Sequence, residues 1–178
     1  HEAARSGLLM KLPASALTVE RLTARNAAGN TPFHAIAKYG GLGLLPPGRV
    51  TSAALSLRND SGYTPLHHAA IGGHLDEVPA EFLTAPLLNL TSNSGYTVFH
   101  VAAAHGHLDQ LPAGLVTPAV ALSRTHLGNT LLHEAAENGT LNRLPAGFLT
   151  LEHRLTRNLG GETVLHVAAF NGHLDQVP

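Results

Sequence analysis

Apolar side chains along this chain gather in short clusters at helical spacing. In the segment 62–79, which reads GYTPLHHAAIGGHLDEVP, Leu66, Ala69 and Ala70 lie three and four positions apart. Side chains at these intervals share one face of a helix, and the paired alanines leave room for a neighbouring helix to come close. Because so short a helix does not persist alone, the pattern predicts that neighbouring segments supply its packing.

Residues on both sides of this cluster mark where the helix begins and ends. Gly62 permits a tight turn with positive φ, and Thr64 can cap a helix through its hydroxyl. Pro65 suits the first helical position, because the N–H that proline lacks has no partner there. Gly73 provides a left-handed cap. The sequence therefore predicts a short helix that begins at Pro65 and ends at Gly73.

The same arrangement returns along the chain at a constant step of 33 residues. Each copy has a glycine, a threonine two residues later, a histidine three residues after that, and a closing glycine six residues further on. The threonine and histidine positions are Thr31 and His34, Thr64 and His67, Thr97 and His100, Thr130 and His133, and Thr163 and His166, with His1 one step earlier. A period of about 20 to 50 residues is typical of a stacked repeat array. We therefore expect one elongated array without an internal domain boundary.

A proline interrupts the second half of every repeat. It recurs as Pro13, Pro46, Pro79, Pro112, Pro145 and Pro178. Because a proline inside a helix costs on the order of 3 kcal/mol, a second helix must stop at this position. A threonine follows five residues later, Thr84 in the central copy, and indicates a new N-cap. We predict a split second helix, with a first part from about Leu75 to Val78, a link P-A-E-F-L, and a further helical turn from Thr84.

Charge and composition narrow the classes of function. The chain has 11 basic and 12 acidic residues, so a nucleic-acid partner is not favoured. It contains no cysteine, which excludes disulfides and thiolate chemistry. No apolar run approaches the roughly 18 residues of a membrane span, and the sequence shows no signal-peptide pattern. We therefore expect no membrane contact and favour an intracellular location.

The repeated segments resemble ankyrin repeats. They read GNTPFHAIAKYGGL, GYTPLHHAAIGGHL, GYTVFHVAAAHGHL, GNTLLHEAAENGTL and GETVLHVAAFNGHL, and are similar to the ankyrin signature G-x-T-P-L-H-x-A-A-x-x-G-H-L. The resemblance implies an all-α solenoid of stacked 33-residue helix-turn-helix repeats with projecting β-turns, which binds proteins on its concave side. The implied single array spans 1–178, with modules at 1–28 (partial), 29–61, 62–94, 95–127, 128–160 and 161–178 (partial).

Two features depart from the ankyrin pattern. The recurrent proline breaks the second helix, and other residues replace the aspartate that is common at the start of the turn. The replacing residues are Asn26, Asn59, Ser92, Thr125 and Asn158. Their side chains can still bond the local backbone, so we expect the turn to survive. These departures suggest a bacterial or metagenomic subfamily.

The abundance of histidine raises the question of a metal site. Six of the 13 histidines share the slot of His67, where the resemblance implies that the imidazole bonds the backbone across the neighbouring turn. Equivalent residues in neighbouring repeats stand roughly 8 to 10 Å apart, too far to share one zinc ion. The segments HEAAR at His1 and HEAAE at His133 lack the second histidine of the zinc-protease motif H-E-x-x-H. We expect no cofactor, metal or catalytic residue, and a metal- or ligand-binding enzyme built from the spare histidines is the unfavoured alternative.

If the constant positions build the scaffold, binding specificity lies in the slots that change between copies. By the resemblance, these slots line the concave face and the turn tips. All three tyrosines, at 39, 63 and 96, fall among them, and aromatic anchors dominate binding energy at interfaces. The alternative is that the turn-tip tyrosines pack on adjacent turns and bind nothing. The candidate protein-binding residues are Lys38, Tyr39, Tyr63, Ile71, Tyr96, His105, His126, Leu127, Glu137, Phe170, Arg58, Arg124 and Arg157.

An arginine precedes four of the turns, at positions 25, 58, 124 and 157. A row of guanidinium groups can grip an acidic partner through paired hydrogen bonds. The alternative, which we favour, is that each arginine pairs with acidic side chains of its own or the next repeat, or with turn carbonyls.

The leading hypothesis is a non-enzymatic protein–protein interaction scaffold that binds a partner protein through the concave face and the turn tips. The alternative is a regulatory or targeting segment of a larger multidomain protein whose catalytic part lies elsewhere. We expect a monomer, with end-to-end stacking as the alternative.

Overall fold

The computed structural model describes residues 14–144 and 147–177. The chain divides into two compact units, residues 1–93 and 94–178, and each is described by itself. The predictions made for His1, Pro13, Pro145 and Pro178 lie outside the described residues. The single array over the whole chain stays a prediction.

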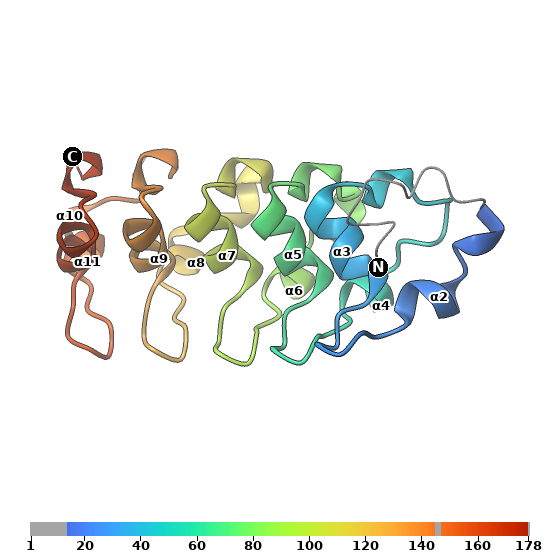
Figure 1. Ribbon diagram of the computed structural model, residues 1–178. Coiled ribbons are helices and arrows are strands. Elements are labelled where there is room, and N and C mark those ends of the chain that lie inside the picture. The colour runs from blue at the N-terminus through green and yellow to red at the C-terminus, as the bar shows by residue number, and fades with distance from the viewer. Residues whose placement is uncertain (1–13, 145–146, 178) are drawn as a thin grey trace. The chain divides into compact units, whose positions relative to one another are not determined.

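Within the described residues both units consist of α-helices and 3-10 turns, the latter labelled η (Figure 1). Unit 1 contains η2 (Ala14–Ala16), α2 (Val19–Thr23), α3 (Pro32–Tyr39), η3 (Leu42–Leu44), α4 (Ser52–Leu55), α5 (Pro65–Gly72), η4 (Leu75–Glu77), η5 (Ala80–Phe82) and α6 (Ala85–Leu88). Unit 2 contains α7 (Val98–His105), η6 (Leu108–Gln110), η7 (Ala113–Leu115), α8 (Pro118–Ala121), α9 (Leu131–Asn138), η8 (Leu141–Arg143), α10 (Leu151–Leu155), α11 (Val164–Phe170) and η9 (Leu174–Gln176). The predicted all-α fold class is confirmed.

The first helix of each repeat begins and ends where the sequence predicts. α5 starts at Pro65 directly after Thr64, and Gly73 closes it with φ 74° and ψ 37°, a left-handed cap. In α3, α5, α7, α9 and α11 the threonine and the histidine three residues later cap the helix reciprocally. Histidine thus holds the position that glutamate or glutamine takes in the usual capping box. In α5 the Thr64 N–H donates to His67 Nδ1 over 3.1 Å.

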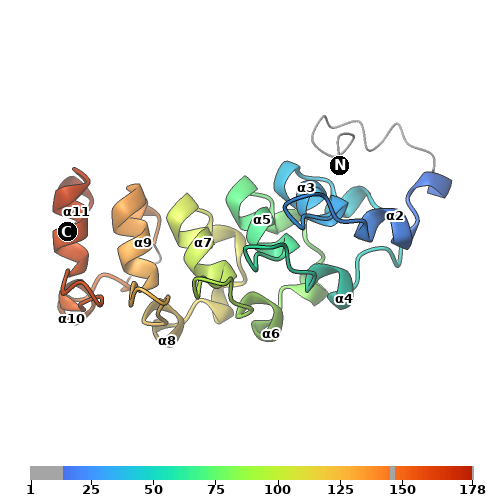
Figure 2. The same ribbon diagram turned by 60° about the horizontal axis from the view of Figure 1, so that its bottom comes forward.

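A layer of apolar side chains holds the helices together inside each unit. Leu66, Ala69 and Ala70 of α5 are fully buried, and so are Phe33 and Ile36 of α3, the helix beside it (Figure 2). In unit 2, α7, α9 and α11 lie side by side in the same way, with short apolar faces in contact (Figures 1 and 2). The predicted packing of small alanine-rich faces against neighbouring helices is therefore confirmed within each unit.

α3 and α5 approach each other most closely at Gly72. A Cβ atom at this position would overlap the backbone carbonyl oxygen of Lys38. The backbone of Gly72 itself has an ordinary helical conformation, since it belongs to α5 and has no positive φ. Gly72 is therefore required by the helix contact rather than by the turn.

The second half of the repeat is split at the proline, as predicted. The two parts on either side of the proline are 3-10 turns, although a helix was expected before the proline and only a link after it. In the central repeat, η4 ends at Glu77, and Val78 is extended ahead of Pro79. The segment predicted only as a link forms η5, in which the Phe82 N–H donates to the Pro79 carbonyl over 2.9 Å. The new helix α6 follows Thr84, as the N-cap signal indicated.

Candidate binding surface

The turns that project between the helices are joined to one another through their backbones. In unit 1 the Asp60 N–H donates to the Ala28 carbonyl over 3.2 Å, and the Asn93 N–H donates to the Ser61 carbonyl over 3.0 Å. Within its own turn, Asn59 Oδ1 accepts from the backbone N–H groups of Ser61 and Tyr63. The asparagine thus holds the turn as an aspartate would. At Thr125 the predicted side-chain bond is absent, because the buried hydroxyl has no hydrogen-bond partner, but the turn is still closed by the Gly128 N–H, which donates to the Thr125 carbonyl over 2.9 Å.

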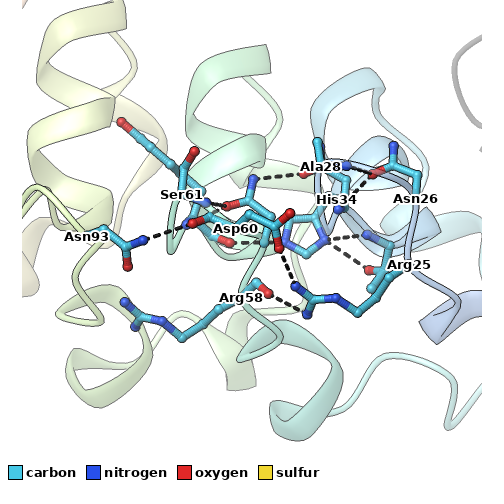
Figure 3. A network of polar contacts seen from close by, with 12 residues as sticks. Arg25, Asn26, Ala28, His34, Arg58, Asp60, Ser61 and Asn93 are labelled. Carbon is cyan, nitrogen blue, oxygen red and sulfur yellow. Dashed lines mark hydrogen bonds and ion pairs between the residues drawn. The ribbon is translucent and has the colours of Figure 1, made fainter.

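In unit 1 the arginines that precede the turns tie each turn to the next, and Figure 3 shows the contacts of Arg25. Arg25 donates through Nη1 to the Arg58 carbonyl over 2.8 Å and through Nη2 to Asp60 Oδ1 over 2.9 Å. The guanidinium of Arg58 donates in turn to the carbonyl of Thr91, the equivalent residue one repeat later. These contacts agree with the alternative that the arginines pair with acidic side chains and turn carbonyls of their own or the next repeat.

In unit 2, Arg124 has the same role, whereas the contact of Arg157 lies within its own turn. Arg124 Nη1 donates to the Gly128 carbonyl of its own turn and to the Arg157 carbonyl of the next repeat, both over 2.7 Å. Arg157 Nη1 donates to the Gly161 carbonyl over 2.5 Å. Because these nitrogens already bind backbone oxygens, an acidic partner would have to compete with the turns for them.

The two turn-tip tyrosines lie partly inside the scaffold. Tyr63 is half-buried, with its ring edge-on to His67 at 5.1 Å between centroids. Tyr96 is also half-buried and stands edge-on to His100 at 6.2 Å. Tyr39 differs because it is exposed, with the Lys38 ammonium 5.7 Å from its ring centroid.

The histidines of the recurrent slot form a column in which His34, His67, His100 and His133 are fully buried, whereas His166 is exposed. His34 Nε2 donates to the Tyr63 carbonyl over 3.0 Å, and His133 Nε2 donates to the Glu162 carbonyl over 3.1 Å. The bond across the neighbouring turn that the ankyrin resemblance implied is therefore present. Burial lowers the pKa of His34, His100 and His133, and the carbonyl contacts offset part of that shift.

The half-buried His68 stands one residue beyond this column. Its ring is edge-on to His34 at 5.1 Å, and its Nε2 is 3.4 Å from Asn59 Nδ2. Burial, together with the positive charges of His34 and Lys38, lowers the pKa of His68 to about 4. The ring is therefore neutral in the folded protein near pH 7.

A ladder of amides and carboxylates runs along the turns of unit 2. Asn158 Nδ2 donates to Asn129 Oδ1 over 2.9 Å and to Glu162 Oε2 over 3.1 Å. Asn129 Nδ2 donates in turn to Oε1 of the buried Glu134 over 3.0 Å. Burial raises the pKa of Glu134, although hydrogen bonds from Asn129 and Tyr96 oppose the shift.

Beside this ladder, unit 2 has a cleft of about 420 Å³ between its turns and the helices α9 and α11. Leu127, Leu159 and Phe170 border it, with exposed fractions of 65%, 79% and 90%. The other lining residues are Asn129, Glu137, Asn158, Gly160, Glu162, Val167 and Asn171. The cleft thus brings together three of the candidate residues, Leu127, Glu137 and Phe170.

The other candidate residues line no part of this cleft. Ile71 is half-buried on α5, whereas His126 is exposed at a turn tip. His105 is exposed at the end of α7, where its Nδ1 lies 3.0 Å from the Val101 carbonyl of the same helix. In unit 1 a shallower hollow of about 480 Å³ lies beside Tyr39, with Leu44 and Glu77 also lining it.

The sequence reasoning missed Leu159 as a candidate. The available signal was a leucine at the turn position one repeat after His126, a place that favours polar residues. Leu159 lies at the same cleft as Phe170 only because the turn is folded.

Two further features of the described residues bear on the function. In residues 14–144 and 147–177 no three histidine, aspartate or glutamate side chains come close enough to hold a metal ion. None of the helices in those ranges is long and apolar enough to cross a bilayer.

Capped short helices that recur every 33 residues and pack through small apolar faces define a helical-repeat protein. Within that class, residues 44–112 match the family model of ankyrin repeats, in 3 copies. This segment therefore consists of ankyrin repeats, and the predicted resemblance is confirmed there. The family comparison detects no enzyme domain, and ankyrin repeats are typically a non-catalytic, protein-binding module. A search of the curated proteins finds no match.

Proposed function

We propose that this chain is a non-enzymatic scaffold that binds a partner protein through its turn tips and the adjoining face of the first helices. The observation that carries the proposal is the cleft of unit 2, where Leu127, Leu159 and Phe170 all expose most of their side chains. Apolar side chains that gather around a cleft at the surface mark interaction sites, whereas scattered ones need no explanation.

The remaining candidate residues differ in how well they suit such a role. His105 and His126 are exposed and extend the surface beyond the cleft, whereas the exposed Glu137 lines the cleft itself. Tyr63 and Tyr96 offer only part of each ring, because the rest packs on the scaffold. We assign Arg58, Arg124 and Arg157 mainly to turn stability, since their nitrogens bind carbonyls.

An affinity capture with matched variants tests the proposal. The unmodified protein and a Leu127→Ala/Phe170→Ala variant serve as baits in a lysate of the source organism, with mass spectrometry of the captured proteins. Leu151→Ala/Leu155→Ala is the control, because it removes the same kind of exposed surface from α10, with exposed fractions of 67% and 51%, outside the cleft.

We expect proteins that the unmodified bait and the control capture equally and the cleft variant loses by about tenfold or more, the effect of removing two interface anchors. Identical capture by all three baits would rule out this surface as the binding site. The melting temperatures of the three baits should agree closely, because the substituted side chains are exposed.

Two finer predictions stay proposals. The regulatory or targeting segment of a larger protein is tested by the gene sequence on both sides of this segment. The monomer is tested by light scattering of the purified chain. The bacterial origin suggested by the split second helix likewise stays a prediction.

A further inference from the structure

The cleft of unit 2 carries charge of one sign only. Among the described residues that line it, the ionisable side chains are Glu137 and Glu162, and both are exposed. Lysine, arginine and histidine are absent from the same lining. An apolar surface bordered by two carboxylates attracts cations and repels anions.

One of the two carboxylates is held in place by the scaffold. Glu162 Oε2 accepts from Asn158 Nδ2 over 3.1 Å, and the Glu162 N–H donates to Asn158 Oδ1 over 2.9 Å. The other amides of the lining are also engaged, since Asn129 bonds Glu134 and Asn171 donates to the Val167 carbonyl. The cleft therefore presents carboxylate oxygens as its strongest polar groups, and one of them is already oriented.

The apolar side chains of the cleft come from two turns and from one first helix. Leu127 and Leu159 lie at successive turns, and Phe170 lies near the end of α11. Phe170 occupies the repeat slot of Glu137, which is exposed on α9 although α11 packs beside that helix. The slot thus faces solvent in both repeats, whereas Lys38, Ile71 and Ala104, which occupy it in the other copies, are half-buried.

We propose that this cleft binds a segment of a partner protein in which a large apolar side chain stands next to lysine or arginine. The apolar side chain covers Leu127, Leu159 and Phe170, while the cation pairs with Glu137 and Glu162. An acidic segment is disfavoured, because its charges would approach two carboxylates with no basic group in the lining to offset them. This inference rests on the proposed function, and it adds the chemistry of the partner.

Selection from a displayed library of random peptides tests the chemistry of the partner directly. The unmodified protein is the target, and peptides that also bind a Phe170→Asp variant are removed at each round. We expect the enriched pool to carry more lysine and arginine than aspartate and glutamate, with leucine, phenylalanine or another large apolar residue beside the basic one. An enriched pool that is acidic or uncharged would overturn the proposed partner chemistry but leave protein binding at this cleft intact.

Binding of the most enriched peptide then separates charge from packing. In fluorescence anisotropy we expect Glu137→Gln/Glu162→Gln to raise Kd by about five- to tenfold at low ionic strength, with a smaller effect at physiological salt. Glu152→Gln is the control, because it removes an exposed carboxylate of α10 outside the cleft. An equal loss in the control, or no loss in the double variant, would contradict the pairing.

Two other outcomes are decisive for the proposal. If no peptide is enriched over the Phe170→Asp variant, both the partner chemistry and the use of this cleft for binding fail. If sedimentation shows a dimer of the unmodified chain that Phe170→Asp separates, the occupant is a second copy of this chain and the partner-segment proposal is wrong. Circular dichroism of every variant should match the unmodified protein, since the substituted positions are exposed.

Discussion

At the scale of single residues, one helix position holds two ionisable groups whose pKa values are shifted in opposite directions. His68 of α5 and Glu134 of α9 occupy the same repeat slot, where other copies have Ala35, Val101 and Val167. Burial lowers the pKa of His68 and raises that of Glu134. Both shifts favour the neutral form of the side chain, so the two residues give opposite pH dependences.

For His68 we predict stability that decreases on acidification. The unfolded ring takes up a proton near pH 6.5 and the folded ring only near pH 4. Between these values the unfolded chain binds more protons, so the free energy of unfolding decreases as the pH is lowered. His68→Val should reduce the slope of the unfolding free energy against pH by an amount that corresponds to at most about one bound proton. Urea unfolding at several pH values measures it, with Val101→Ala as a control that changes packing but no titrating group. An unchanged slope in His68→Val would contradict the assignment.

For Glu134 we predict that the carboxylate costs stability at neutral pH. Because its folded pKa lies above the ordinary value of 4.5, its favourable contribution is present at lower pH and is lost as pH rises through the folded pKa. Glu134→Gln keeps an acceptor for Asn129 and should stabilise the protein by on the order of 1 kcal/mol at pH 7, but not near pH 4. Thermal unfolding at the two pH values tests this, and a less stable variant at pH 7 would disprove it.

At the scale of helices and turns, the repeat is built from short elements whose ends are fixed by side chains. The threonine and histidine of each first helix satisfy backbone groups at its start, and the histidine continues to the next turn. One small side-chain pair therefore both starts a helix and attaches it to its neighbour. The 3-10 turns η4 and η5 have no side-chain cap, and turns of three residues need packing on the rest of the repeat, as the buried Leu75 of η4 provides.

The contact between α3 and α5 gives a prediction at this scale. Gly72→Ala should destabilise unit 1 by about 2 kcal/mol, because the new Cβ would push against the Lys38 carbonyl and force the two helices apart. Gly43→Ala is the matched control, since its Cβ would meet only the Glu77 carbonyl oxygen, at 3.7 Å. Chemical denaturation of the two variants measures the difference, and equal stabilities would show that α3 and α5 adjust freely.

The reciprocal cap gives a second prediction at this scale. Thr130→Val removes the hydroxyl that lies 2.8 Å from His133 Nδ1 at the start of α9 but keeps a side chain of similar volume. We expect a loss of about 1 kcal/mol, the usual cost of removing an N-cap oxygen. Thermal unfolding compares it with Thr156→Val, an exchange of the same two side chains outside the first helices, where the loss should be smaller.

At the scale of the whole molecule, each compact unit contains its own buried residues and its own stacked helices. We therefore predict that residues 94–178, produced alone, keep a helical circular dichroism spectrum and unfold cooperatively. The stability of the fragment should be lower than that of the full chain, because stability in repeat arrays adds with the number of neighbouring repeats. A random-coil spectrum of the fragment would show that unit 2 requires unit 1.

The parts of the structure that the sequence could predict are those with a local cause. The start of α5 at Pro65 and its end at Gly73 follow from residues that act on their immediate neighbours, and so does the break at Pro79. The 3-10 form of η4 and η5 could not be predicted, because periodicity over three residues does not separate a 3-10 turn from a helix.

The binding cleft was only partly predictable for a different reason. The proximity of Leu159 and Phe170 is a property of the stacked turns, and it cannot be read from their separation in sequence. The free or bound state of the arginines likewise depends on which carbonyls the folded turns place within reach. The sequence could offer both alternatives for Arg124, and the folded turns of unit 2 place two carbonyls at its Nη1.

The arginine contacts between turns have a consequence for how such a chain can grow. Arg25 and Arg124 each hold the carbonyl of the residue 33 positions later, and Arg58 does the same to Thr91, which is not an arginine. Because the acceptor is a backbone carbonyl, this hydrogen bond can form with any amino acid at that position. A gene duplication that inserts an extra repeat, or a recombination that exchanges two repeats, would therefore give neighbouring turns that can form this hydrogen bond without a compensating mutation.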